Sequence, residues 1–210
     1  MIRLLLADDH TLFREGLKQL LEQHDDIRIV AEASTGGEVL EQLRHQEFDL
    51  LLLDISMPGV SGSDLIGRVR TRCPQLPILV LSMYNEPQLA RRKLKAGAAG
   101  YVTKDTDAAM LVNAIRKVAA GGHFIVPDLA EQMVFQDESV STPRPHTRLT
   151  ERELQILRML VKGKGLNEIA SELTISNKTV STHKVRMMRK MNITSNAELI
   201  RYAITNGITP

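Results

Sequence analysis

Short apolar runs alternate with amphipathic segments through roughly the first 120 residues of the chain. Five of these runs have the length of β-strands, and several are too continuously apolar to leave one face in water. They are Ile2–Leu6, Ile27–Ala33, Leu50–Ile55, Ile78–Ser82 and Tyr101–Thr103. Repeated strand-then-helix units build a parallel sheet with helices on both faces, joined by right-handed crossovers. The pattern therefore predicts a doubly wound α/β domain with a five-stranded parallel sheet over residues 1–121.

The pattern changes after Gly121 and Gly122, a pair that predicts the end of a helix. Periodicity fades over residues 122–146, which are polar and interrupted by proline, and this composition predicts a linker. Helical spacing resumes at Thr150 without any strand-like segment after it. Two pairs have the spacing of a capping box, Thr150 with Glu153 and Ser195 with Glu198. Residues 147–210 are therefore predicted to form a small all-helical domain of four helices.

Composition narrows the class of protein. The 210 residues are 43% apolar, which is enough for two modest cores. Cys73 is the only cysteine, so no internal disulfide can form, and no cluster has the spacing of zinc ligands. No apolar run approaches the roughly 20 residues of a membrane helix, and Asp8 and Asp9 come too early for a signal peptide. We therefore expect a cytoplasmic protein with no membrane partner.

Charge is distributed unevenly along the chain. Residues 1–125 carry 15 Lys/Arg against 16 Asp/Glu, and residues 126–147 carry 1 against 4. Residues 148–210 carry 11 against 5, a net charge of +6. A small basic module suggests a polyanionic partner, although a solvated basic face explains the same numbers equally well.

Residues that suit a metal–phosphoryl site follow four of the predicted strands. Asp8 and Asp9 follow the first strand, Asp54 closes the third, Ser82 closes the fourth, and Lys104 follows the fifth. Ligands of such sheets bind beyond the carboxyl ends of the strands, where these side chains would meet. Converging carboxylates repel one another unless a hard cation such as Mg²⁺ binds them, and a hydroxyl and an ammonium suit a phosphoryl group. Each residue alone is more simply a turn or surface residue, but the five together favour one site.

The C-terminal module contains two short helical pieces around a polar turn, with Ser176 placed to cap the second. On this second helix Val180, Met187 and Met191 fall near helical spacing and should face the core. The opposite side carries short polar side chains with basic flanks, as expected for docking in a DNA major groove. The residues predicted to contact DNA are Lys178, Thr179, Ser181, Thr182, Lys184, Val185, Arg186 and Arg189. An amphipathic helix of a protein-interaction bundle would look similar.

Residues 1–120 resemble the receiver domain of two-component response regulators. The motifs that carry the resemblance are Ala7-Asp8-Asp9-His10, Leu53–Gly59, Leu81–Tyr84 and Gly100–Asp105. The resemblance implies that Asp54 accepts a phosphoryl group from a phosphohistidine of a sensor histidine kinase. It also implies Mg²⁺ as cofactor, held by Asp8 or Asp9, by Asp54 and by the backbone carbonyl of Ser56.

Three further roles follow from the same resemblance. Ser82 would hydrogen-bond a phosphoryl oxygen, Lys104 would pair with the phosphoryl group, and Tyr101 would be an aromatic switch that turns inward. The sequence departs from many receivers at Asp105, where a proline is common, so the geometry of the Lys104–Asp105 peptide bond is left open.

Four elements of residues 147–206 carry a second resemblance: Leu149–Glu153, Gly163, Asn167–Ala170 and Thr179–His183. With them this module resembles the DNA-binding domain of the LuxR/NarL class, and the whole chain resembles the NarL/FixJ subfamily of response regulators. This implies a transcription regulator whose phosphorylation at Asp54 controls binding of the helix-turn-helix to promoter DNA. It also implies a homodimer on phosphorylation, with Ala197–Ala203 contributing to pairing, and RNA polymerase as a further partner. A Mg²⁺-dependent phosphatase is the enzymatic rival, but Ser56 replaces the second acid of such enzymes. A regulator controlled by a protein partner or ligand, independent of phosphorylation, is the other alternative.

Overall fold

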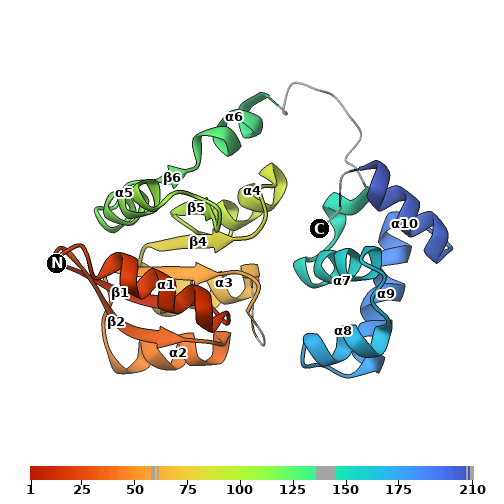
Figure 1. Ribbon diagram of the computed structural model, residues 1–210, viewed down its shortest axis with the longest axis horizontal. Coiled ribbons are helices and arrows are strands. Elements are labelled where there is room, and N and C mark those ends of the chain that lie inside the picture. Colours follow the sequence, from red (N-terminus) through yellow and green to blue (C-terminus); the bar gives the residue numbers. More distant parts are fainter. Residues whose placement is uncertain (58–59, 61, 136–144, 207, 209–210) are drawn as a thin grey trace. The chain divides into compact units, whose positions relative to one another are not determined.

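A computed structural model of the chain describes residues 1–57, 60, 62–135, 145–206 and 208. The chain divides into two compact units, residues 1–139 and 140–210, and each is considered by itself (Figure 1). Part of the predicted linker, residues 136–144, and two residues of one receiver motif, Pro58 and Gly59, lie outside the described residues. Within the described part of the chain, no helix is long and apolar enough to cross a membrane.

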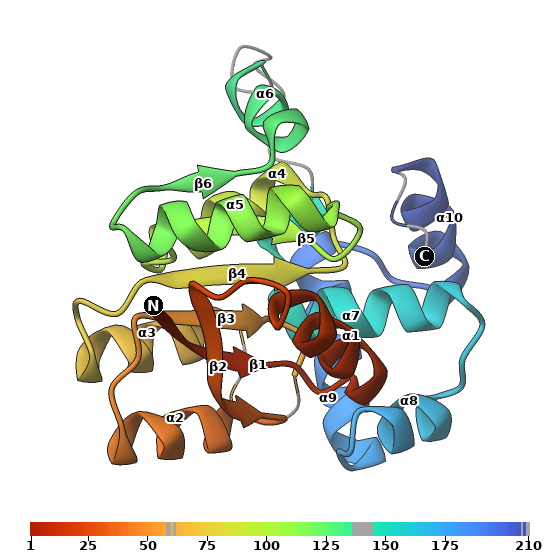
Figure 2. The same ribbon diagram turned by 60° about the vertical axis from the view of Figure 1, so that its left-hand side comes forward.

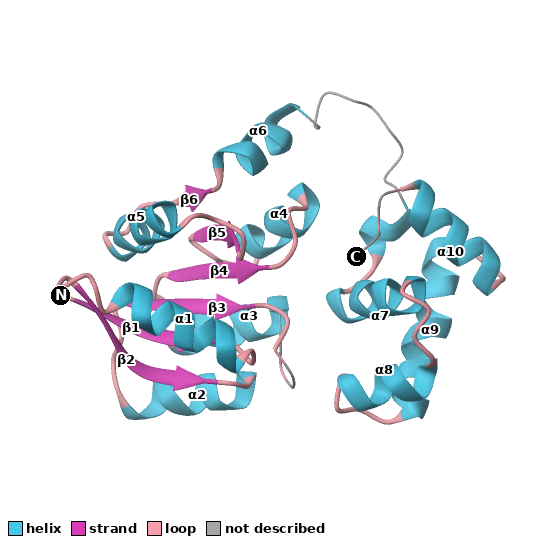
Figure 3. Cartoon of the chain, viewed as in Figure 1, coloured by secondary structure: helices cyan, strands magenta, loops and turns pink. Residues whose placement is uncertain are grey.

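The first unit is built on a parallel sheet with the strand order β2-β1-β3-β4-β5-β6 (Figure 3). The strands are β1 (Ile2–Ala7), β2 (Ile27–Ala33), β3 (Leu50–Asp54), β4 (Ile78–Ser82), β5 (Gly100–Thr103) and β6 (Phe124–Ile125). Every residue of β3, β4 and β5 is buried, as expected for inner strands covered on both faces. The doubly wound parallel α/β fold and all five predicted strands are confirmed.

Five helices cover the two faces of this sheet, α1 (Thr11–Leu21), α2 (Gly36–His45), α3 (Gly62–Arg72), α4 (Pro87–Lys95) and α5 (Ala108–Ala119). Because side chains alternate along a strand, Leu51 and Leu53 enter one core while Leu52 enters the other. The first core contains apolar residues of α2, α3 and α4, and the second contains those of α1 and α5. Figure 2 shows α1 and α5 together on one side of the sheet.

The sheet has six strands where the sequence predicts five, because β6 lies inside the stretch predicted as linker. Phe124 and Ile125 pair with Gly100 and Tyr101 of β5. Helix α6 (Pro127–Phe135) then packs on α4, with the side chain of Leu129 fully buried. The start of the predicted linker is therefore a structured extension of the first unit. A two-residue strand has no periodicity of its own, so hydrophobic pattern could not reveal it.

The second unit contains a short 3-10 helix, η1 (Pro145–Arg148), and the four predicted helices. These are α7 (Glu151–Val161), α8 (Leu166–Glu172), α9 (Asn177–Met191) and α10 (Asn196–Thr205). The hydroxyl of Thr150 accepts from Glu153 N and the Glu153 carboxylate accepts from Thr150 N, so this capping box forms as predicted. The second predicted box forms in part. Ser195 caps α10, but the Glu198 carboxylate accepts from Thr194 rather than from Ser195.

Candidate functional site

Two buried carboxylates and one ammonium meet at the carboxyl edge of the sheet in the first unit. Asp8 follows β1 and Asp54 ends β3, and both are buried almost completely. Lys104 follows β5, where its backbone N–H donates to the carbonyl of Ser82 at 2.7 Å, which ties the two strand ends together. Its Nζ lies 2.6 Å from Asp8 Oδ2 and 2.8 Å from Asp54 Oδ2. The predicted convergence of these side chains is present.

The electrostatics of Asp54 are set by burial and by two donors. The Ser56 backbone N–H donates to Asp54 Oδ1 at 2.8 Å, and Lys104 Nζ donates to Asp54 Oδ2. Burial raises the pKa of Asp54 above its usual range, while the ammonium of Lys104 opposes the shift and the charge of Asp8 adds to it. Any further cation that reaches Asp54 would favour the charged form of its carboxyl group.

The donor set fits a hard divalent cation. Asp8, Asp9, His10 and Asp54 each offer a ligand atom, and these four atoms all lie within 4.8 Å of one another. Among the residues that the structure describes, the buried atoms Asp8 Oδ2 and Asp9 Oδ1 receive no hydrogen bond. The short contact of Asp8 Oδ2 with Lys104 is an ion pair whose angles do not make it a hydrogen bond. Carboxylate oxygens of this kind suit a hard cation such as Mg²⁺, which usually binds one or two carboxylates and keeps several waters.

The predicted switch residues lie beside this cluster. Ser82 is buried at the end of β4, and its hydroxyl accepts from the backbone N–H of Tyr84 at 3.1 Å. The Tyr101 ring is fully buried, and its hydroxyl donates to the carbonyl of Tyr84 at 2.7 Å. Burial raises the pKa of Tyr101, so its phenol stays a donor. The Lys104–Asp105 peptide bond, left open by the sequence, is trans.

Three residues near the cluster were given no role by the sequence. His10 belongs to the motif Ala7–His10 but has no role predicted from the sequence, and its Nδ1 lies 3.0 Å from Asp9 Oδ1. Lys104 Nζ lies 4.6 Å from the centre of the Phe13 ring, a cation–π contact. Arg14 donates to the carbonyl of Asp8 at 2.6 Å and so fixes the backbone there.

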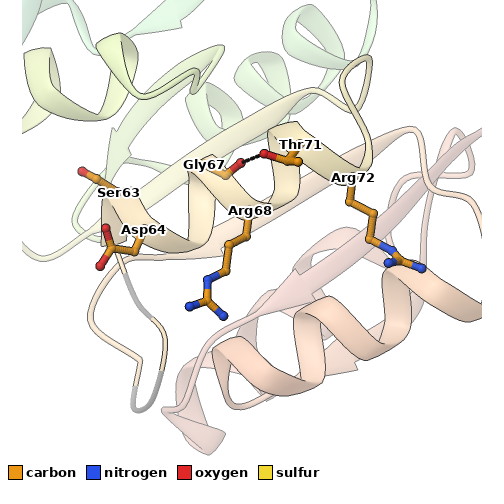
Figure 4. A pocket seen from close by; sticks show the side chains of 6 residues that line it. All are labelled: Ser63, Asp64, Gly67, Arg68, Thr71 and Arg72. Atoms are coloured by element: carbon orange, nitrogen blue, oxygen red, sulfur yellow. Dashed lines mark hydrogen bonds between the residues drawn. The ribbon is translucent and has the colours of Figure 1, made fainter.

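An open hollow in the first unit lies apart from this cluster, on the outer side of α3 (Figure 4). It is lined by Ser63, Asp64, Gly67, Arg68, Thr71 and Arg72. The Thr71 hydroxyl donates to the Gly67 carbonyl within the helix, and Figure 4 shows Arg68 and Arg72 extending without converging on a common point. Most of these residues are exposed. The hollow has neither the burial nor the chemistry of the acidic cluster, so we assign no site to it.

Replacement of Lys104 by methionine should leave the buried carboxylates uncompensated. We expect the free energy of unfolding of the metal-free protein to fall by about 3–5 kcal/mol, the usual effect of removing one partner of a buried ion pair. Saturating Mg²⁺ should recover part of the loss, because a ligand that binds only the folded state stabilises it. Urea unfolding with and without Mg²⁺ measures both effects. The control Lys95→Met, at an exposed position of α4, should change stability by less than about 0.5 kcal/mol. Equal losses in the two variants would contradict the assignment.

In the second unit, α8, a short turn and α9 form the helix-turn-helix. The turn ends at Ser176, whose hydroxyl accepts from Thr179 N at 3.1 Å, as predicted. Val180, Met187 and Met191 are buried, which places the opposite side of α9 in solvent. Of the residues predicted to contact DNA, Lys178, Thr182, Val185, Arg186 and Arg189 are exposed, and Thr179, Ser181 and Lys184 are partly exposed.

A buried ion pair holds α9 against α7. The carboxylate of Glu153, which is almost completely buried, accepts from Lys190 Nζ at 2.7 Å and from Thr150 N at 2.7 Å. Burial alone would raise the pKa of Glu153, but these donors outweigh it and lower the pKa below its usual range. The pair therefore fixes the long helix whose other side is exposed.

Replacement of Glu153 by glutamine should destabilise the second unit in a pH-dependent way. A carboxyl whose folded pKa is lowered stabilises the fold above its unfolded pKa, and this contribution is lost as the pH falls through the folded pKa. We expect a loss of about 1–3 kcal/mol at neutral pH, typical of a charged hydrogen bond. The difference should shrink below about pH 4, the ordinary pKa of a glutamate. Thermal unfolding of both proteins across this range measures it, and a difference independent of pH would contradict the electrostatic explanation.

Comparison with known proteins identifies a family for each of the two units of the chain. Residues 4–116 match the family of response regulator receiver domains, and residues 147–203 match the bacterial regulatory proteins of the luxR family. Response regulator UvrY of Escherichia coli (strain K12) is 39% identical over 209 residues, which cover 99% of this chain and 96% of UvrY. Response regulator GacA of Pseudomonas protegens is 36% identical over 208 residues, which cover 99% of this chain and 98% of GacA.

Solved structures extend the likeness to the whole chain. RcsB from Salmonella enterica serovar Typhimurium, bound to promoter P1flhDC in the presence of the phosphomimetic BeF3⁻, is 28% identical with a TM-score of 0.67. The match covers 97% of this chain and 98% of that RcsB chain. With the acidic cluster at the sheet edge and the exposed helix of the second unit, these matches establish that the chain belongs to the NarL/FixJ family of two-component response regulators, which join a receiver domain to a LuxR-type DNA-binding domain.

Proposed function

We propose that Asp54 accepts a phosphoryl group from a phosphohistidine of a sensor histidine kinase and that this event controls binding of promoter DNA by α9. The observation that carries the proposal is the position of Asp54. It is held at the end of β3 between the ammonium of Lys104, the N–H of Ser56 and the carboxylate of Asp8. Phosphoryl transfer depends mainly on positioning and charge stabilisation, which this arrangement supplies.

The transfer forms an acyl phosphate. An oxygen of Asp54 attacks phosphorus, the P–N bond of the phosphohistidine breaks, and its electron pair returns to the imidazole nitrogen of the kinase. We assign the cofactor as Mg²⁺, with Asp8, Asp9, Asp54 and the carbonyl of Ser56 as its ligands. Bound there, it would neutralise charge on the phosphoryl oxygens and the carboxylates. Lys104, whose Nζ already contacts Asp54, would pair with a phosphoryl oxygen.

Ser82 and Tyr101 would transmit the change. Both are buried, and both contact the backbone of Tyr84. The Ser82 hydroxyl accepts from the Tyr84 N–H, and the Tyr101 hydroxyl donates to the Tyr84 carbonyl. A hydroxyl drawn towards the phosphoryl group would disturb this pair of hydrogen bonds and the start of α4. Asp54 would later lose the group by self-hydrolysis, so the protein would act as a switch rather than as a turnover enzyme.

The output would be DNA binding by the second unit in the cytoplasm. The short polar side chains and Val185 on α9 would meet base edges, and the Lys and Arg residues beside them would meet phosphates. Solved RcsB structures contain dimers bound to DNA, and we propose a homodimer on phosphorylation for this chain as well, with RNA polymerase as a further partner.

Sedimentation velocity of the full chain tests the proposal. With Mg²⁺ and beryllofluoride, which mimics an aspartyl phosphate, we expect a shift from monomer towards dimer, and Asp54→Ala should abolish it. A shift that persists in Asp54→Ala, or one that does not need Mg²⁺, would contradict the proposal. That result would favour a regulator controlled by a protein partner or ligand instead.

A further inference from the structure

His10 occupies the turn between β1 and α1, immediately after the two carboxylates of the cluster. Its backbone N–H donates to Asp8 Oδ1 at 2.8 Å, and this closes the turn that brings the imidazole back over the cluster. Nδ1 lies 3.0 Å from Asp9 Oδ1, 3.2 Å from Asp8 Oδ1 and 3.8 Å from Asp54 Oδ2. The imidazole therefore faces three carboxylates that come from two different strand ends.

Helix capping does not explain a histidine at this position. His10 is the N-cap residue of α1, where Ser, Thr, Asp or Asn usually accepts a hydrogen bond from the first turn. Its side chain makes no such hydrogen bond, and its backbone is extended, which any residue adopts. Packing does not explain it either, since 61% of the side chain is exposed. The contacts that the structure gives this imidazole are those with the carboxylates.

The arrangement of these atoms suits a metal ion with one nitrogen ligand. Neighbouring ligands of an octahedral ion with bonds of about 2.1 Å lie about 3 Å apart, close to the distances from Nδ1 to Asp8 and Asp9. Mg²⁺ prefers oxygen ligands throughout, whereas imidazole is a good ligand for first-row transition metals. Asp8 also offers a carboxylate oxygen to the same cluster, and its buried Oδ2 receives no hydrogen bond among the described residues and is paired only with the ammonium of Lys104 at 2.6 Å.

We infer that His10 is a metal ligand of this receiver site and gives it a preference for first-row divalent transition metals over Mg²⁺. The inference rests on the proposed function, because it concerns the same metal site. It adds a nitrogen ligand to the oxygen ligands assigned above. His10 should increase the affinity least for Mn²⁺, more for Co²⁺ and most for Ni²⁺, which is the order in which these ions favour nitrogen ligands. It should not increase the affinity for Mg²⁺.

The same distances also allow His10 to act as a hydrogen-bond donor that compensates the carboxylates, and the two roles predict opposite results. A compensating donor competes with any cation, so its removal would raise the affinity for all four ions by similar factors. A ligand instead lowers the affinity when it is removed, and the loss depends on the ion. A series of metals therefore separates the two roles.

Isothermal titration calorimetry of the full chain with Mg²⁺, Mn²⁺, Co²⁺ and Ni²⁺, at one mildly alkaline pH, provides the test. We expect His10→Asn to weaken Ni²⁺ binding by about tenfold or more, since loss of even an outer-shell partner of a metal ligand has an effect of this size. The loss should be smaller for Co²⁺, smaller again for Mn²⁺, and within error for Mg²⁺. The visible spectrum of bound Co²⁺ should also change when the nitrogen ligand is removed.

Two controls assign the effect to the cluster. His45→Asn, at an exposed position at the end of α2, should leave every affinity at this site unchanged. In an Asp54→Ala background, which removes a carboxylate from the cluster, the effect of His10→Asn should largely disappear. Equal changes for all four ions, or no change for any, would overturn the inference. If Mg²⁺ binding still supports phosphorylation of Asp54 in those cases, the proposed function stands and only the role of His10 fails.

Discussion

Replacement of Asp54 by alanine is expected to abolish phosphoryl uptake while leaving the protein folded. Asp54 is the buried carboxylate that both Lys104 and the Ser56 N–H contact, so no other side chain occupies its position. Incubation with a small phosphodonor and Mg²⁺, followed by intact-mass measurement, should show one added phosphoryl group on the wild type and none on the variant. The loss is complete rather than graded, because the nucleophile itself is removed.

The variant should also be at least as stable as the wild type without metal. Burial dominates the raised pKa of Asp54, which means that its charged form is unfavourable in the folded protein, and in the variant Lys104 keeps Asp8 as a partner at 2.6 Å. Urea unfolding without Mg²⁺ provides the control for folding. Asp9→Ala is the matched comparison for uptake, since it removes a carboxylate of the same cluster and leaves the nucleophile. Uptake that persists in Asp54→Ala would contradict the assignment of the acceptor, and it would do so most clearly if Asp9→Ala abolished uptake.

Replacement of Val185 by glutamate is expected to abolish specific DNA binding. Val185 lies on the solvent side of α9 and is 66% exposed, so the change costs the fold little. In the major groove of DNA, the variant would lose an apolar contact and place a carboxylate among base edges and phosphates. A single lost base contact costs about 1–3 kcal/mol, or about 5- to 150-fold in affinity, and each subunit of a dimer contributes one. Fluorescence anisotropy on a selected target sequence measures the effect.

A matched substitution is available in the other unit. Val134 on α6 is 65% exposed, so Val134→Glu makes the same chemical change at nearly the same exposure. We expect its DNA affinity to stay within about twofold of the wild type, because α6 lies in the receiver unit and carries none of the predicted DNA contacts. Equal losses in both variants would indicate a general effect of charge and would contradict the assignment of α9 as the recognition helix.

Most of the fold could be predicted from the sequence because its strands are long and strongly apolar. The inner strands are continuously buried, so their apolar runs mark them directly, and the glycine pair after α5 marks the end of that helix. The segment around β6 and α6 could not be predicted in this way. Leu129 is the one residue of that segment that is fully buried among those described, and a single apolar anchor leaves no periodic signal.

The candidate site was predictable to the extent that strand ends determine which residues meet. Asp54 ends a strand, and Asp8 and Lys104 directly follow strands of the same parallel sheet, so their convergence at its carboxyl edge follows from topology. The contact of Phe13 with Lys104 joins residues far apart in the chain, and the position of the His10 imidazole depends on one turn. Neither leaves a pattern in a single sequence. The recognition helix is a different case, because its core side was predicted from spacing while its DNA-binding role came from family resemblance.

Phosphorylation of Asp54 is proposed to control DNA binding, and one measurement tests this coupling most directly. A target sequence is first selected from genomic DNA with the full chain, and its affinity is then measured by anisotropy with and without Mg²⁺ and beryllofluoride. We predict that the phosphate mimic changes the affinity of the wild type by at least about tenfold, a coupling of about 1.4 kcal/mol, and leaves that of Asp54→Ala unchanged. The same affinity with and without the mimic in the wild type, on a target that it binds specifically, would contradict the claim.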